Sequence, residues 1–287
     1  MYGAIEAGGT KMVCAVCDDK MNMITKEKID TEDPEITLPK ILSFFSQYDI
    51  NGLGVGAFGP VGVNPKEDDY GYIGKTPKPG WSHFDLLGYL KKEITAPIFL
   101  TTDVNVAAYG ELKEGAAKGL SDAVYLTVGT GIGGGIIHQG QIYSGRSHSE
   151  LGHILLKRSP DEINGFTGVC PYHHDCLEGM ASGPAIAARG GVKANTLDPR
   201  DPLWAIEADY LAEAAMTYTL CFAPERIIFG GGVSNQAHLF PEIRKRFTKL
   251  LDDYVQVPNV DNYIVHAALG DDAGITGALL LAQKVSK

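Results

Sequence analysis

The sequence lacks any cluster of lysine and arginine residues. Acidic side chains outnumber basic ones by 35 to 25, which gives a formal net charge of −10. A nucleic-acid-binding surface needs a clustered basic face, so the composition argues against that class of function. It does not argue against nucleotide binding, because such a site is local and is built largely from backbone groups.

Long apolar runs are also missing. No stretch of the chain approaches the roughly 20 apolar residues that a membrane helix requires. The first residues enter an apolar run at once, without the basic region and apolar stretch that mark a secretory signal. We therefore expect a cytoplasmic protein that has no membrane partner.

Cysteine is scarce, with five residues in 287. In a reducing compartment we expect no disulfide, and cysteines that lie close in sequence more often bind metal. Cys170 and Cys176 frame a Cys-x2-His-x2-Cys pattern through His173, and His153 lies upstream. Two thiolates and two imidazoles suit a closed, structural zinc site, although unliganded cysteines and surface histidines are the alternative.

The apolar residues fall into short runs that alternate with helical patterns, which predicts an α/β fold. The first two strands, with Gly8–Lys11 between them, are typical of a β-hairpin. The expected strands cover 2–7, 12–17, 53–58, 98–100, 124–128, 135–138 and 227–229. The expected helices cover 37–48, 83–94, a segment from 103 onward, 203–222 and about 273–285.

Three glycine turns end apolar strands, at Gly8–Lys11, Gly129–Gly135 and Gly230–Gly232. Such turns direct several backbone N–H groups toward one point, which is what a phosphate oxygen needs. Each turn taken alone is more often a simple tight turn. Neither a Walker pattern nor a Rossmann glycine pattern is present. The strand–turn–strand plan near 8 and again near 131 indicates a weak internal repeat and two related lobes.

Asp103 follows a strand and opens a helix. Aspartate is a favoured helix N-cap, and most residues in such a position have only that role. The end of a strand in an α/β fold is also where catalytic side chains gather. Phosphoryl transfer needs a carboxylate that accepts the hydroxyl proton, so both interpretations apply to this residue.

Five segments resemble the signatures of the ROK family (repressors, open reading frames and kinases), a branch of the actin-like ATPase superfamily. They are Ile5–Lys11, Asp103–Ala108, Thr127–Gly135, Glu150–His153 and 227–235, in family order along nearly the whole chain. Within the family the chain is most similar to the fructokinases. These share the Ile-Glu-Ala-Gly-Gly-Thr-Lys opening and a Cys-Pro-x-His-x-Asp-Cys segment.

The resemblance implies an α/β actin-like ATPase (ribonuclease-H-like) fold, with two lobes and a cleft between them that holds ATP and sugar. The N-terminal lobe is expected over 1–112, joined by the C-terminal helix 273–287. The C-terminal lobe, with the zinc-binding loop, is expected over 113–272. The resemblance also implies a homodimer.

The resemblance assigns roles to individual residues. Asp103 becomes the general base, and the sugar is expected to contact Asp103, Glu150, His153 and Glu178. Structural Zn²⁺ is expected on His153, Cys170, His173 and Cys176, while the adjacent His174 is left out. ATP, bound with Mg²⁺, is expected to contact Gly8, Gly9, Thr10, Lys11, Thr130, Pro184, Gly231, Gly232, Val233, Ser234 and Asn235.

Two departures from the family pattern bear on these roles. Many members have Asp where this chain has Glu6, an acid that the family places near the magnesium ion. Many family sugar kinases have Asn, which contacts the sugar, where this chain has Thr102. The second departure favours a ketohexose over glucose.

The expected function is therefore ATP-dependent phosphorylation of D-fructose to fructose 6-phosphate. The alternatives are a glucose, mannose or N-acylhexosamine kinase of the same family, or a sugar-sensing regulator without kinase activity. A ROK repressor would carry a helix-turn-helix ahead of the first lobe, and here only Met1 precedes the first strand.

Trp81 follows a Pro-Gly turn and has two interpretations. It either stacks on a sugar face or is simply packed in the protein.

Overall fold

The computed structural model describes all residues from Met1 to Lys287, and they divide into two compact units. The first unit comprises Met1–Glu114, Ile142–His148 and Asp271–Lys287. The second comprises Gly115–Gln141 and Ser149–Gly270. The C-terminal helix thus groups with the first unit. The segment 142–148 also groups with the first unit, whereas the boundaries expected from the sequence assigned it to the C-terminal lobe, 113–272.

The first unit is built on a five-stranded mixed sheet with the order β3-β2-β1-β4-β5. Strands β1, β2 and β3 form an antiparallel meander, and β4 and β5 then run parallel to β1. The expected hairpin around Gly8–Lys11 is confirmed. The strands are β1 (Tyr2–Ala7), β2 (Lys11–Cys17), β3 (Met23–Asp30), β4 (Leu53–Ala57) and β5 (Ile98–Thr102).

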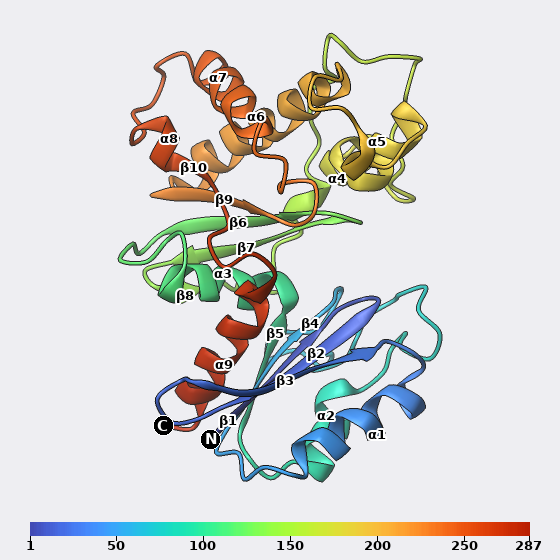
Figure 1. The fold of residues 1–287 in the computed structure, drawn as a ribbon, viewed down its shortest axis with the longest axis vertical. Helices are drawn as coiled ribbons and strands as arrows, with labels where there is room; N and C mark the ends of the chain where they lie inside the picture. Colours follow the sequence, from blue (N-terminus) through green and yellow to red (C-terminus); the bar gives the residue numbers. More distant parts are fainter. The chain divides into compact units, whose positions relative to one another are not determined.

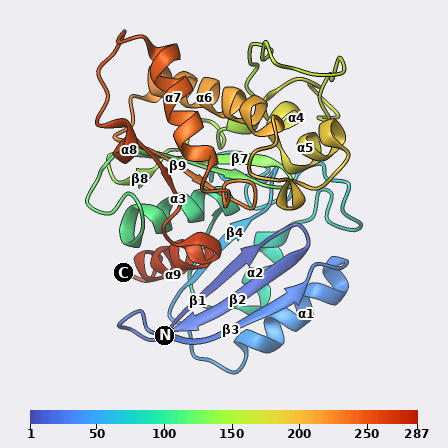
Figure 2. The ribbon, with the colours of Figure 1, turned by 45° about the horizontal axis from the view of Figure 1, so that its top comes forward.

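Helices cover both faces of this sheet (Figures 1 and 2). Helices α1 (Pro34–Phe45) and α2 (Leu86–Glu93) lie on one face, where Leu38 and Leu90 enter the core. Helices α3 (Asp103–Glu114) and α9 (Ala273–Val285) pack on each other, and α9 also packs on β1 and β4. Helix α1 begins three residues earlier than its apolar pattern indicates, because Pro34 is pre-set for the first helical turn.

The second unit repeats the topology of the first. Its sheet has the order β10-β9-β6-β7-β8, in which β6 and β7 are antiparallel and β9 and β10 run parallel to β6. If the five strands of each unit are numbered 1 to 5 along the chain by their place in the repeat (β6, β7, β8, β9, β10 for the second unit), both sheets have the order 3-2-1-4-5. The strands are β6 (Ala123–Val128), β7 (Ile132–His138), β8 (Gln141–Ile142), β9 (Arg226–Gly230) and β10 (Ile264–His266). The internal repeat expected from the two glycine turns is therefore confirmed.

The helices of the second unit bury a separate core. The long helix α6 (Leu203–Phe222) packs against α7 and α4, and it contributes Tyr210 and Leu211 to that core. The other helices are α4 (Leu177–Ala181), α5 (Gly183–Gly190), α7 (Leu239–Leu251) and α8 (Val260–Tyr263). Short 3₁₀ helices are η1 (Leu151–His153), η2 (Ala194–Thr196) and η3 (Gly270–Asp272). None of the helices combines the length and the apolar character that crossing a bilayer requires.

The second glycine turn is shorter than the sequence indicates. We expected a loop over Gly129–Gly135, whereas β7 already begins at Ile132, so only Gly129–Gly131 forms the turn. The glycines that follow are strand residues. A Cβ on Gly134 would lie 2.7 Å from the Leu151 side chain, so this glycine lets η1 approach the sheet closely.

Candidate functional site

The predicted site residues of the first unit meet at one edge of its sheet. Ala7, Ala57 and Thr102 are the last residues of β1, β4 and β5, and they lie opposite one another in the parallel register. The turn after β1 and Asp103 after β5 therefore emerge at the same edge, on either side of β4. Two strand spacings put them about 10 Å apart.

In the turn Gly8–Lys11 the backbone carbonyls are all engaged. The Gly8 oxygen accepts from the Thr31 hydroxyl at 2.9 Å, and the Thr10 oxygen accepts from the Thr31 N–H at 3.0 Å. The Lys11 oxygen accepts from Gly8 N–H at 3.0 Å, and the Gly9 oxygen accepts from the Lys78 ammonium. The N–H groups of Gly9 and Thr10 donate no hydrogen bond within the protein. The turn thus presents donors without competing acceptors, as an anion site requires.

Asp103 is not the residue that caps its helix. Thr102 fills that position, because its hydroxyl accepts from the Asn105 N–H at 3.2 Å. Asp103 occupies the first helical turn, is half-buried, and accepts from the Val104 N–H at 2.8 Å. The sequence left open that Asp103 is only a helix cap. In the structure Thr102 has that role.

Glu6 belongs to a group of carboxylates at this edge. The pKa of Glu6 is raised to about 7, chiefly by burial and also by the negative charges of Asp103, Asp272 and Asp271, against the opposing charge of Lys26. Lys26 itself forms an ion pair with Asp272. The group therefore holds more negative than positive charge. Oxygen ligands of this kind are those that Mg²⁺ prefers.

In the second unit three backbone segments converge. The Gly129 carbonyl accepts from the N–H of Gly183 at 2.7 Å, which fixes the start of α5 against the second glycine turn. The Val128 carbonyl accepts from the N–H of Val233 at 2.9 Å, which brings in the third turn. Pro184 follows Gly183 in the first turn of α5, and the Ser182 hydroxyl caps the helix by accepting from Ala185 N–H at 3.3 Å.

An unusual buried hydroxyl follows the third turn. Ser234 is 1% exposed, and its Oγ has no hydrogen-bond partner in the protein. Asn235 lies beside His266, with 3.1 Å between its side-chain oxygen and the imidazole Nε2. Ser234 and Asn235, both expected to contact ATP, therefore place polar groups just after the end of β9.

Glu150, His153 and Glu178 also belong to the second unit. The N–H of His153 donates to the Glu150 carbonyl at 3.1 Å, so one 3₁₀ turn joins the two residues. Glu178 lies on α4, and its carboxylate accepts from the N–H of Ile132 at 2.9 Å. That bond links a residue expected at the sugar to the strand that follows the second glycine turn.

Four potential metal ligands converge in the same unit. The ligand atoms of His153, Cys170, His173 and Cys176 all lie within 4.8 Å of one another. His153 Nδ1 is 3.4 Å from Cys176 Sγ and 3.4 Å from His173 Nδ1. Cys170 Sγ is 3.8 Å from His153 Nδ1 and 4.0 Å from His173 Nδ1. Tetrahedral zinc with ordinary bond lengths requires separations of roughly 3.3–3.8 Å between such ligands. Three of these four separations lie in that range and the fourth is close to it, so a small adjustment of the ligands would accommodate the ion.

His174 takes no part in this cluster of ligands. Its φ is +55°, in the left-handed region that glycine favours, and its side chain is exposed. The residue shapes the turn between His173 and Cys176. The four residues that converge do not include His174, as the expected ligand set has it.

Trp81 is packed and does not line a binding surface. It is 1% exposed, its ring centroid lies 5.7 Å from that of Phe58, and its indole N–H donates to the Glu32 carbonyl at 2.7 Å. The same segment delivers Lys78 to the turn at Gly9, a contact that sequence patterns did not reveal. The only local signal is a lysine between two prolines in Pro77-Lys78-Pro79.

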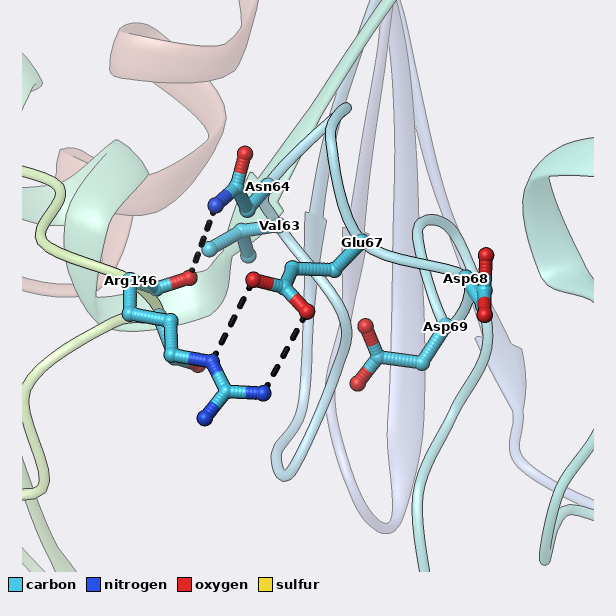
Figure 3. A pocket seen from close by; sticks show the side chains of 7 residues that line it. Val63, Asn64, Glu67, Asp68, Asp69 and Arg146 are labelled. Carbon is cyan, nitrogen blue, oxygen red and sulfur yellow. Dashed lines mark hydrogen bonds and ion pairs between the residues drawn. The ribbon is translucent and has the colours of Figure 1, made fainter.

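A separate pocket of about 450 Å³ lies in the first unit (Figure 3). Across it Arg146 faces Glu67, with nitrogen–oxygen distances of 3.2 and 3.4 Å, and its carbonyl accepts from the Asn64 amide at 3.0 Å. The guanidinium is largely exposed, so this ion pair adds little to stability. The residues that line the pocket are Val63, Asn64, Glu67, Asp68, Asp69, Arg146 and Ser147, none of which is a predicted site residue.

The raised pKa of Glu6 predicts a pH dependence of stability. Between pH 4.5 and about 7 the folded state keeps a proton on Glu6 that the unfolded state releases, so this group lowers the free energy of unfolding as the pH rises through that window. Glu6→Gln should remove this decline. The free energy of unfolding of the variant, minus that of the parent, should therefore be larger at pH 8 than at pH 5, by a few kcal/mol at most.

Urea unfolding at pH 5 and pH 8, without magnesium or nucleotide, measures this difference. Glu27→Gln, at an exposed position on β3, is the matched control and should leave the pH dependence unchanged. Parallel pH profiles for Glu6→Gln and the parent would show that Glu6 ionises normally in the folded protein.

The chain matches known proteins along almost its whole length. The model of the ROK family matches residues 2–285. A fructokinase from Pediococcus pentosaceus is 47% identical over 287 residues, covering 100% of this chain and 99% of that protein. A fructokinase from Streptococcus mutans serotype c is 41% identical over 290 residues, covering 100% of this chain and 98% of that protein.

Among solved structures, the ROK family glucokinase from Streptomyces griseus, in complex with glucose and AMPPNP, is 26% identical with a TM-score of 0.71. The match covers 99% of this chain and 98% of that one. The likeness confirms the expected α/β actin-like fold with a mixed sheet in each of two units. A family match over almost every residue, on a chain with this repeated sheet topology, leads to one assignment: the protein belongs to the ROK family.

Proposed function

We propose that this protein catalyses the ATP-dependent phosphorylation of D-fructose to fructose 6-phosphate. The observation that carries the proposal is the end-to-end match, at 47% and 41% identity, to two proteins named fructokinase. A related structure was solved with glucose and AMPPNP, a hexose and an ATP analogue. The turn with two unengaged amides supports the same chemistry from this chain's own geometry.

Asp103 is proposed as the general base. Because Thr102 makes the capping hydrogen bond, the Asp103 carboxylate is not required for that role. In the reaction the sugar hydroxyl oxygen forms a bond to the terminal phosphorus of ATP while the bond to the bridging oxygen of ADP breaks. The hydroxyl proton passes to the Asp103 carboxylate.

The Gly8–Lys11 turn is proposed to bind phosphate through the N–H groups of Gly9 and Thr10. The hydroxyl of Thr10 and the ammonium of Lys11 are the further donors of this turn. In the second unit Thr130, Pro184 and Gly231–Asn235 are proposed to hold the rest of the nucleotide. The buried, unpartnered Ser234 hydroxyl supports a polar ligand at this position.

Glu150, His153 and Glu178 are proposed to bind the sugar hydroxyls. Carboxylates suit this task because each oxygen accepts strong hydrogen bonds from neighbouring hydroxyl groups. His153 serves two purposes in this proposal. Its Nδ1 faces the cysteine sulfurs, so Nε2 is left to interact with the sugar.

Zn²⁺ is proposed on His153, Cys170, His173 and Cys176, where the ligand separations and the two-sulfur, two-nitrogen donor set fit the ion. The site is structural, because four protein ligands complete the tetrahedron. It ties the loop of Cys170 to His153 and thereby to the sugar-binding turn. Metal loss should therefore weaken sugar binding as well as stability.

Mg²⁺ is proposed to enter with ATP, on the side of the carboxylate group that contains Glu6. When bound, it neutralises charge on the transferred phosphoryl group. The excess of carboxylates around Glu6 fits a divalent cation.

The choice of sugar rests partly on Thr102. Because this residue stands where many family sugar kinases have a sugar-contacting Asn, it supports fructose over glucose as the substrate.

A coupled assay of ADP formation with fructose, glucose, mannose and N-acetylhexosamines tests the function. Fructose should give the highest kcat/KM, and NMR of the product should place the phosphate on C6. A higher kcat/KM for glucose or an N-acetylhexosamine would transfer the assignment to the other kinases of the family. ADP formation that does not depend on any sugar would refute the kinase proposal.

Asp103→Asn should lower kcat by about 10²–10⁴-fold, because the variant lacks the base, while the dissociation constant for fructose should change far less. Steady-state kinetics and sugar titration measure the two effects. Asp68→Asn, at an exposed position in the same unit, is the matched control and should be fully active. Turnover of Asp103→Asn within a few-fold of the parent would rule out the role of base.

Metal analysis of the purified protein should find about one zinc per chain. Cys176→Ser should lose the metal, raise the KM for fructose and lower the melting temperature, since the loop is no longer anchored. Cys221→Ser, at an exposed cysteine outside the cluster, should behave like the parent. A zinc-free protein with unchanged KM and melting temperature would contradict the proposed site.

A further inference from the structure

We propose that Lys78 is a positioning residue of the phosphate turn. Its ammonium holds the Gly9 carbonyl and thereby directs the Thr10 N–H toward the phosphate of bound ATP. This inference rests on the proposed function of the turn, and it concerns a residue far from the turn in sequence.

The contact itself is direct. The Lys78 Nζ donates to the Gly9 carbonyl. A Cβ built on Gly9 would lie 2.7 Å from Nζ and 2.9 Å from Cε of Lys78, so the end of the lysine side chain lies against this residue. A side chain at position 9 would therefore displace the end of the lysine from this contact.

The geometry of the peptide bond converts this contact into a direction for an amide. The Gly9 carbonyl and the Thr10 N–H belong to one trans peptide, so they point in opposite directions. A carbonyl held by Lys78 therefore fixes the Thr10 N–H on the opposite side. Thr31 acts on the preceding peptide in the same way, because its hydroxyl holds the Gly8 carbonyl at 2.9 Å and so directs the Gly9 N–H.

The turn needs such a restraint because two of its residues are glycines. A peptide next to a glycine can rotate at little steric cost. If the Gly9–Thr10 peptide turned over, its carbonyl oxygen would take the place of the N–H and would repel a phosphate. Lys78 opposes that rotation with a charge-assisted hydrogen bond, which is stronger than a neutral one.

The surroundings of Lys78 keep it available for this contact. Pro77 and Pro79 flank it, and Trp81 anchors the segment through the Glu32 carbonyl. The ammonium lies 5.4 Å from the centroid of the Phe58 ring, a favourable cation–π arrangement. No carboxylate forms an ion pair with Lys78, whereas Lys26 pairs with Asp272 and Lys40 with Glu32.

The test compares Lys78→Met, which keeps the length of the side chain and loses the donor, with Lys78→Arg, which keeps a charged donor. Dissociation constants for ATP and adenosine are measured by equilibrium titration without sugar. Lys78→Met should weaken ATP binding about 10- to 100-fold and leave adenosine binding unchanged. Lys78→Arg should recover most of the ATP affinity. Lys75→Met, an exposed lysine nearby, is the matched control and should match the parent.

Unchanged ATP affinity in Lys78→Met, or an equal loss for ATP and adenosine, would overturn the inference. Circular dichroism and the melting temperature of Lys78→Met show whether the variant is folded, and Lys78→Arg tests the same contact if it is not. Titration without sugar separates this inference from the proposed reaction. A chain that phosphorylates no hexose yet loses ATP affinity in Lys78→Met would refute the reaction and support the role of Lys78.

Discussion

The turn Gly8–Lys11 is the constraint on which the account of this protein depends. Its carbonyls are each held by another group, among them Thr31 and Lys78, so the N–H groups of Gly9 and Thr10 are left to a ligand. An isolated glycine turn would present oxygens and hydrogens alike. Hydrogen bonds from Thr31 and Lys78, which lie outside the hairpin, leave amide donors exposed here, as the proposed anion site requires.

Strand topology explains why the other functional groups lie where they do. Parallel strands that end in register bring the turn after β1 and Asp103 after β5 to one edge of the first sheet. In the second unit the same topology brings the turns after β6 and β9 together. The repeated fold therefore places one glycine turn in the first unit and two in the second, each at the end of a strand.

Much of this was predictable from the sequence because it depends on local patterns. The hairpin, helix α6, the internal repeat and the Cys-x2-His-x2-Cys cluster follow from periodicity and short spacing. Other features depend on contacts between distant residues, such as Lys78 with Gly9 and Glu178 with Ile132. The cap on Thr102 is a local contact with Asn105, but Thr102 and Asp103 are both favoured capping residues, so the sequence does not choose between them. The early start of β7 at Ile132 depends on its pairing with β6.

The central claim, that the first turn binds phosphate through its amides, is tested most directly by amide NMR of ¹⁵N-labelled protein. On addition of Mg·ATP, the Gly9 and Thr10 amide protons should shift downfield and exchange more slowly with water, because each gains a hydrogen bond to phosphate. Unchanged Gly9 and Thr10 signals, at an ATP concentration that shifts the amide of Gly232, would contradict the account.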